Sequence, residues 1–96
     1  MLSKIPINLE KVNQKDIDKE IIRAALIAEL DAINLYEEMA ALAKDNIIKQ
    51  VLLDVAKEEK EHVGEFQTLL LMYDKEQVEE LEEGKEEVEE LIEKGE

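Results

Sequence analysis

The chain has 96 residues, of which 26 are acidic and 12 basic, and it contains no cysteine. Its net charge of −14 repels nucleic-acid backbones, and the missing thiols exclude disulfides, thiolate ligands and cysteine nucleophiles. No apolar run approaches the roughly 20 residues that cross a bilayer, and the first residues have no signal-peptide core. The sequence therefore predicts a small soluble cytoplasmic protein with neither nucleic acid nor membrane as a partner.

A long helix is predicted over about residues 16–44, after an extended arm. The first dozen residues contain Pro6 and show no helical period, so we expect them to be extended. Asn13 and Asp16 are both suitable residues to cap the start of a helix. The stretch that follows has no glycine or proline and is rich in alanine, leucine and glutamate, which are strong helix formers.

A second long helix is predicted over about residues 47–73. The Asp45–Asn46 pair is a turn signal and can also cap the helix that follows it. The only break in the helical pattern is Gly64, which destabilises a helix by ~1 kcal/mol relative to alanine.

The last segment, residues 74–96, differs in charge from the rest of the chain. It holds 12 acidic and 3 basic residues, a net of −9, whereas residues 1–73 have a net charge of −5. Asp74 and Gln77 fit a capping box for a short helix, which Gly84 is expected to interrupt. The apolar residues left after it are Val88, Leu91 and Ile92. We therefore predict two units, a helical hairpin with its arm over 1–73 and a short acidic helix with a linker or tail over 74–96. The tail after Gly84 is expected to be marginal or disordered.

Two antiparallel helices of ~40 Å each cannot enclose a core by themselves. Because the chain is short, it buries only roughly 60–65% of the surface that its unfolded state exposes. A metal, an oligomer or both are the stabilisers left to a scaffold without disulfides. We expect an all-α fold in which two chains pair into a four-helix bundle.

One stripe of residues along the first helix has the spacing of a buried seam, with steps that alternate between four and three. It consists of Ile22, Leu26, Glu29, Ile33, Tyr36, Ala40 and Ala43. Glu29 is its one carboxylate. The corresponding stripe on the second helix consists of Ile48, Leu52, Val55, Glu59, His62, Phe66, Leu69 and Tyr73. Glu59 and His62 stand in its middle, where apolar residues are expected, and their charged neighbours fall off the stripe and should face water.

Glu29 and Glu59 are predicted to lie at one level of the hairpin. They stand 16 residues before and 14 residues after Asp45, which is ~24 Å and ~21 Å from the turn. His62 follows one helical turn beyond Glu59 on the same face. Two neighbouring carboxylates and an imidazole in a seam need compensation, and a metal ion supplies it. Iron and manganese suit these ligands, and zinc tolerates them.

Each residue also has a simpler interpretation. Glu29 or Glu59 could pair with a lysine, and His62 could be a hydrogen-bonded core histidine. The convergence of all three on facing seams favours the metal. Tyr36 could donate a hydrogen bond to a ligand carboxylate or be a core aromatic residue, and the two interpretations stay open. Ordinary solvated positions are expected at Asp31, Asn34, Glu37 and Glu38. The glutamate-rich tail is expected to be a solvated linker rather than a metal-binding segment.

The sequence resembles the encapsulated ferritins, which are two-helix members of the ferritin superfamily whose catalytic site forms between chains. The resemblance covers about residues 13–73 and is carried by the segments AELDAINLYEEMA and EEKEHVGEF. Ferritin-like proteins build a di-iron site from a glutamate on each of two helices and a Glu-x-x-His pair on each of the other two. This chain offers half of that set. By motif match, Glu29, Glu59, His62 and Tyr36 correspond to the ferroxidase-centre residues, the first three as metal ligands.

The resemblance implies a ferroxidase that oxidises Fe²⁺ to Fe³⁺ at a di-iron centre between two chains, for iron storage and detoxification. It also implies a ring of dimers, typically a decamer, inside an encapsulin nanocompartment. Two features depart from the family pattern. Ala28 stands where some relatives carry an acidic residue at which metal ions enter, which leaves Asp31 as the nearby candidate. The chain also lacks the apolar docking peptide of cargo relatives, so we favour a C-terminal fusion to a shell domain.

Two other functions compete with the ferroxidase. A rubrerythrin-like peroxide reductase uses similar ligands, although this chain has no cysteines to bind an electron-transfer iron. A helical hairpin that only mediates assembly would use no metal chemistry, and it would form the same oligomer with or without Fe²⁺.

Overall fold

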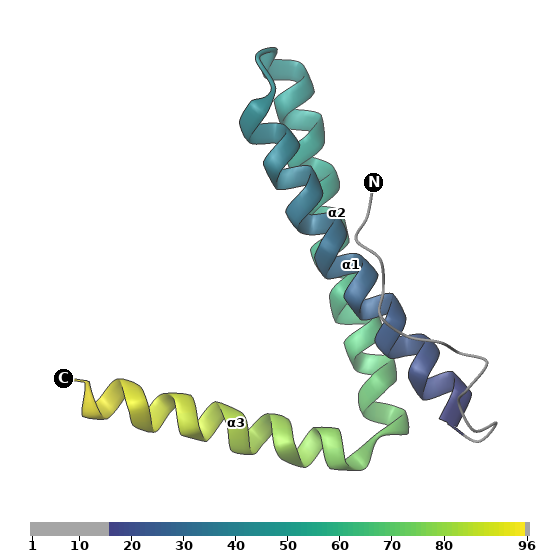
Figure 1. Ribbon diagram of the computed structural model, residues 1–96, viewed down its shortest axis with the longest axis vertical. Helices are drawn as coiled ribbons and strands as arrows, with labels where there is room; N and C mark the ends of the chain where they lie inside the picture. Colours follow the sequence, from purple (N-terminus) through teal and green to yellow (C-terminus); the bar gives the residue numbers. More distant parts are fainter. Residues whose placement is uncertain (1–15, 96) are drawn as a thin grey trace.

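The computed structural model describes residues 16–95, which form three helices (Figure 1). Helix α1 spans Ile17–Leu42, α2 spans Asn46–Tyr73 and α3 spans Lys75–Lys94. Helices α1 and α2 run antiparallel along each other, whereas α3 leaves the end of α2 at a steep angle. The molecule is therefore L-shaped, with principal extents of 47 × 46 × 20 Å. The prediction of an all-α fold with a long two-helix hairpin is confirmed.

The ends of the hairpin helices have identifiable causes. The Asp45 carboxylate accepts hydrogen bonds from the backbone N–H groups of Ile47 at 2.8 Å and Ile48 at 3.0 Å, so it caps α2 as predicted. Asp16 does precede α1, but its side chain makes no capping hydrogen bond and instead lies 3.6 Å from Lys19 Nζ. The other candidate cap, Asn13, and the predicted extended arm lie outside the described residues.

The core of the hairpin is small and contains no buried polar residue within 16–95. Its buried side chains are Ile22, Ala32, Ile33, Ala40, Ala56 and Leu70. Half of them are alanines, which allow the two helix axes to approach closely. Every member of the stripe predicted on α1 is buried or partly buried.

The stripe predicted on α2 is partly wrong. Ile48, Leu69 and Tyr73 are exposed, and the residues that face α1 lie on a neighbouring line of the same helix. That line consists of Leu52, Ala56, Glu59, Val63, Phe66 and Leu70. A single neighbouring helix covers only one side of an apolar stripe this wide. The predicted stripe therefore marks the border between the side of α2 that α1 covers and a side that nothing in the described chain covers.

The predicted short helix after Asp74 is confirmed, but the expectation of an interruption at Gly84 and of a marginal or disordered tail after it is wrong. Residues 75–94 form one continuous helix, α3, which runs through Gly84 although no residue of α3 is buried. The Asp74 side chain caps it by accepting a hydrogen bond from the backbone N–H of Gln77 at 3.1 Å. Glutamate, leucine and lysine are strong helix formers, and their sum outweighs the ~1 kcal/mol that a single glycine costs. No helix within residues 16–95 is long and apolar enough to cross a membrane.

Candidate metal centre

The structure brings Glu29 of α1 together with Glu59 and His62 of α2. His62 Nδ1 lies 3.3 Å from Glu29 Oε2 and 3.5 Å from Glu59 Oε2. One ligand atom from each of the three residues lies within 4.8 Å of the other two, a spacing that a single metal ion can bridge. They form the only such group of three or more acidic or histidine residues in the described part of the chain. Glu29 and Glu59 therefore lie at the same level of the hairpin, as the helix lengths predicted. We call these three residues the Glu–His cluster.

The Glu–His cluster lies at the edge of the hairpin and not in its core. The side chains of Glu29 and Glu59 are 20% and 19% exposed, whereas that of His62 is 43% exposed. The carboxylates are thus shielded by the two helices, while the imidazole lies open to solvent. A ligand can approach from the histidine side without any movement of the hairpin.

Among residues 16–95, His62 is the only residue that pairs with the two carboxylates. Neither Glu29 nor Glu59 pairs with a lysine or arginine of the described residues. In the tautomer that carries its proton on Nδ1, His62 donates a hydrogen bond to Glu29. The interpretation in which a lysine neutralises a cluster glutamate is therefore not supported within residues 16–95. A divalent cation would take the place of the proton between His62 Nδ1 and Glu29 Oε2. It would also add the positive charge that the two carboxylates lack.

The surface beside the Glu–His cluster is apolar and uncovered. Exposed large apolar residues follow the His62 side of α2 at helical spacing, two on each side of the cluster. They are Ile48, Val51, Leu69 and Tyr73, and we call them the α2 apolar strip. Within residues 16–95, α1 covers the other side of α2 and nothing covers this strip. The half-open ligand set and the uncovered strip therefore share one face.

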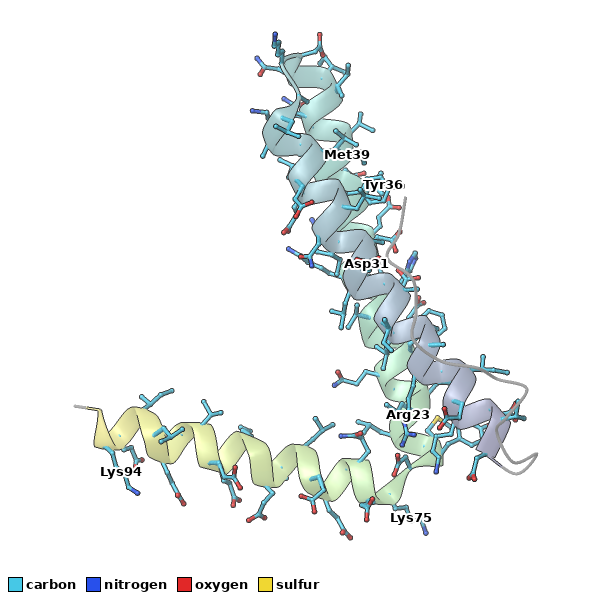
Figure 2. All side chains as sticks on the ribbon, viewed as in Figure 1. Arg23, Asp31, Tyr36, Met39, Lys75 and Lys94 are labelled. Atoms are coloured by element: carbon cyan, nitrogen blue, oxygen red, sulfur yellow. The ribbon has the colours of Figure 1, made fainter. Side chains whose placement is uncertain are left out.

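Tyr36 is not hydrogen-bonded to the Glu–His cluster. It lies on α1 two turns beyond Glu29 (Figure 2), where it is partly buried and makes no hydrogen bond to any of the residues 16–95. Of the two interpretations left open for Tyr36, the hydrogen bond to a ligand carboxylate is thus not formed among residues 16–95. Tyr36 packs as an aromatic residue whose hydroxyl has no partner among the described groups.

The residues expected to be solvated behave in two ways. Asn34, Glu37 and Glu38 are exposed or partly exposed, whereas Asp31 is partly buried and lies outside the Glu–His cluster. Glu37 Oε2 also pairs with Lys60 Nζ at 3.1 Å, an interaction that the sequence reasoning missed. Depth along the hairpin would not have revealed it, because Glu37 stands 8 residues before Asp45 whereas Lys60 stands 15 residues after it.

Comparison with known proteins gives consistent results. The EncFtn-like family model matches residues 5–83. A ferritin-like–encapsulin shell fusion protein of Pyrococcus furiosus is 59% identical over 85 residues, which cover 88% of this chain and 25% of that relative. The chain thus spans about a quarter of the length of the curated relative it matches. The crystal structure of the encapsulated ferritin domain from Pyrococcus furiosus superposes with a TM-score of 0.80 at 57% identity, over 95% of both chains. Because the family model covers most of the chain and this solved domain shares its fold and sequence, the protein belongs to the EncFtn-like family.

Proposed function

We propose that the chain is a ferroxidase, which oxidises Fe²⁺ to Fe³⁺ at a di-iron centre formed between two copies. The observation that carries the proposal is the Glu–His cluster, whose ligand atoms lie within 4.8 Å of one another on an uncovered face. Carboxylate oxygen and neutral imidazole nitrogen are ligands that Fe²⁺ accepts, and no lysine or arginine of residues 16–95 competes for Glu29 or Glu59.

The need for a second copy follows from the number of ligands. One chain supplies two carboxylates and one imidazole, which is half of the ligand set that ferritin-like bundles use for two irons. A copy related by a twofold axis would supply the other half and would bury the α2 apolar strip against its counterpart. We propose that such dimers assemble further into a ring, as a decamer.

The two irons are the substrate, and each residue of the Glu–His cluster has its own role. Glu59 bridges both Fe²⁺ ions at the dimer axis, while Glu29 and His62 each hold one ion terminally. Each Fe²⁺ loses one electron, and an oxidant such as dioxygen accepts the two electrons together. The carboxylates also stabilise the higher charge of Fe³⁺. Tyr36 adds only a modest effect on the rate, because its hydroxyl makes no hydrogen bond to the Glu–His cluster within the chain.

The place of the reaction is proposed from the Pyrococcus relative, which is a fusion of a ferritin-like domain with an encapsulin shell. We propose that this chain works inside an encapsulin nanocompartment, which would store the Fe³⁺ that the chain produces. In that arrangement residues 1–73 are the catalytic unit, which contains the hairpin, and residues 74–96 are the acidic segment that leads toward a fused shell domain.

An aerobic iron-oxidation assay tests the proposal. Purified protein is mixed with Fe²⁺ in air, and Fe³⁺ formation is followed by absorbance against an anaerobic control. We expect rapid oxidation by the unaltered chain and only the rate of buffer for Glu59→Ala, which removes the bridging ligand. Glu58→Ala is the matched control, since it removes the same charge from an exposed neighbouring position of α2. It should oxidise iron like the unaltered chain.

Three results would contradict the proposal. One is oxidation by Glu59→Ala at the rate of Glu58→Ala. Another is an Fe²⁺-soaked crystal in which metal is bound by Glu37, Glu38 or the glutamates of α3 while the Glu–His cluster holds none. The third is a chain that assembles normally but never oxidises iron, which would favour the purely structural hairpin.

A further inference from the structure

The joint between α2 and α3 consists of a single residue, Asp74. Helix α2 ends at Tyr73 and α3 begins at Lys75, and the backbone of Asp74 is extended, with φ −137° and ψ 90°. The chain turns sharply at this residue, and Figure 1 shows α3 as a free arm.

The free arm has an apolar side that the hairpin does not cover. Its exposed apolar residues are Val78, Leu81, Val88, Leu91 and Ile92. Figure 2 shows that the acidic side chains of α3 lie mainly on the outside of the L, whereas its inner side carries mostly hydrocarbon. The hydrophobic effect alone would favour the return of this stripe to the apolar surface of the hairpin. A contact at the joint that opposes this return would keep the stripe open.

The Asp74 carboxylate connects all three helices. Its Oδ2 accepts a hydrogen bond from Arg23 Nη2 of α1 at 2.7 Å, and its Oδ1 caps α3 through the N–H of Gln77 at 3.1 Å. Arg23 Nη1 in turn donates to Glu20 Oε2 at 3.2 Å, which orients the guanidinium group. The Asp74 side chain is only 10% exposed, whereas that of Arg23 is 41% exposed, so the contact is shielded on the carboxylate side and open to water on the guanidinium side.

We propose that Arg23 and Asp74 form a clamp that holds α3 away from the hairpin and keeps its apolar stripe open. Closing the L would require α3 to rotate about Asp74, which would break the ion pair and the helix cap together. The clamp is also stable in its charged form. The Gln77 N–H, the Arg23 guanidinium and the nearby Lys19 ammonium together hold the pKa of Asp74 below its ordinary value.

The distance between the two arms of the L tests the clamp. Because the chain has no cysteine, Gln50→Cys at the hairpin end and Glu90→Cys on α3 provide two unique sites for spin labels. Both positions are exposed and lie outside the Glu–His cluster. Labelled full-length chains are diluted with unlabelled ones, so that pulsed electron resonance reads distances within one chain. We expect one narrow peak at long distance for the otherwise unaltered protein.

Two variants break the clamp in different ways. Arg23→Gln removes the cation, and Asp74→Ser removes the anion but keeps a residue that caps helices well. In both we expect the narrow peak to be lost and shorter distances to gain population. Lys60→Gln is the matched control, because it removes another ion pair between the helices, Lys60–Glu37, and should keep the peak. Arg23→Lys should restore much of the peak.

The outcomes separate a clamp from a helix cap. A narrow long-distance peak in Arg23→Gln would overturn the proposal. If Asp74→Ser loses the peak while Arg23→Gln keeps it, then Asp74 acts only on the end of α3 and the proposal also fails. Circular dichroism of each variant checks that the helices are retained. A loss of peak in Lys60→Gln as well would show general loosening of the hairpin and would count against a specific role for Arg23.

Discussion

The hairpin and the α3 arm are both helical, but they are stabilised in different ways. The hairpin buries Ile33 and Leu70 between its helices, whereas α3 buries no residue at all. The arm depends on its own sequence, on the Asp74 cap and on favourable end charges, with Glu76 in its first turn and Lys94 in its last. Tertiary burial therefore determines the hairpin, and local interactions determine the arm. The proposed metal chemistry belongs to the first region only.

The largest expected effect concerns association through the hairpin. Without metal, a dimer would place four carboxylates and two imidazoles against one another, so chelation should weaken it strongly. Native mass spectrometry or light scattering with Fe²⁺ and with chelator measures this change. Glu59→Ala should respond little to chelator, because it has lost the bridging ligand, while Glu58→Ala should respond like the unaltered chain. If the oligomers of the unaltered chain are the same with Fe²⁺ and with chelator, the proposed di-iron dimer is contradicted.

A smaller effect contrasts a buried leucine of the hairpin with an exposed leucine of the α3 arm. Leu70→Ala should lower the free energy of unfolding of the hairpin by about 2–4 kcal/mol, because Leu70 is buried and its loss leaves a cavity. Leu81→Ala removes the same atoms from the exposed face of α3 and should change the free energy by less than about 0.5 kcal/mol. Thermal unfolding in chelator, followed by circular dichroism, measures both. A cost for Leu81→Ala that equals the cost for Leu70→Ala would mean that another molecule covers the arm.

The sequence predicted the hairpin well because helical signals in it are local. Helix formers, the Asp45 cap and the glycine-free stretch predicted both helices to within about two residues of their ends. The approach of Glu29 to Glu59 also followed, since the helical rise fixes depth along an antiparallel pair. The roles of these residues as metal ligands stay a prediction.

The features that the sequence could not predict depend on the rotation of a helix about its own axis and on contacts between residues far apart in the chain. Spacing along α2 does not show which part of a wide apolar stripe its one neighbour covers, so Ile48 and Leu69 were wrongly placed inside the seam. The Arg23–Asp74 contact joins residues 51 positions apart at a joint whose geometry only the folded chain defines. The helicity of α3 was underestimated because burial was treated as necessary for order. A capped helix rich in glutamate does not require it.

The smallest expected effect tests whether α3 depends on local propensity. Gly84 lies in the middle of α3, its φ is not positive, and a Cβ added there would meet nothing within 4 Å. Gly84→Ala should therefore stabilise the arm by ~1 kcal/mol, which corresponds to about fivefold slower hydrogen exchange of the amides around it. Hydrogen exchange read by mass spectrometry measures this change peptide by peptide. Gly64→Ala is the matched change in α2, where a Cβ also meets nothing within 4 Å, and it should slow exchange only in the hairpin. If Gly84→Ala leaves exchange in α3 unchanged or makes it faster, the arm is not governed by its own helical propensity. In that case a contact with another molecule at this point of α3 would have to supply its order.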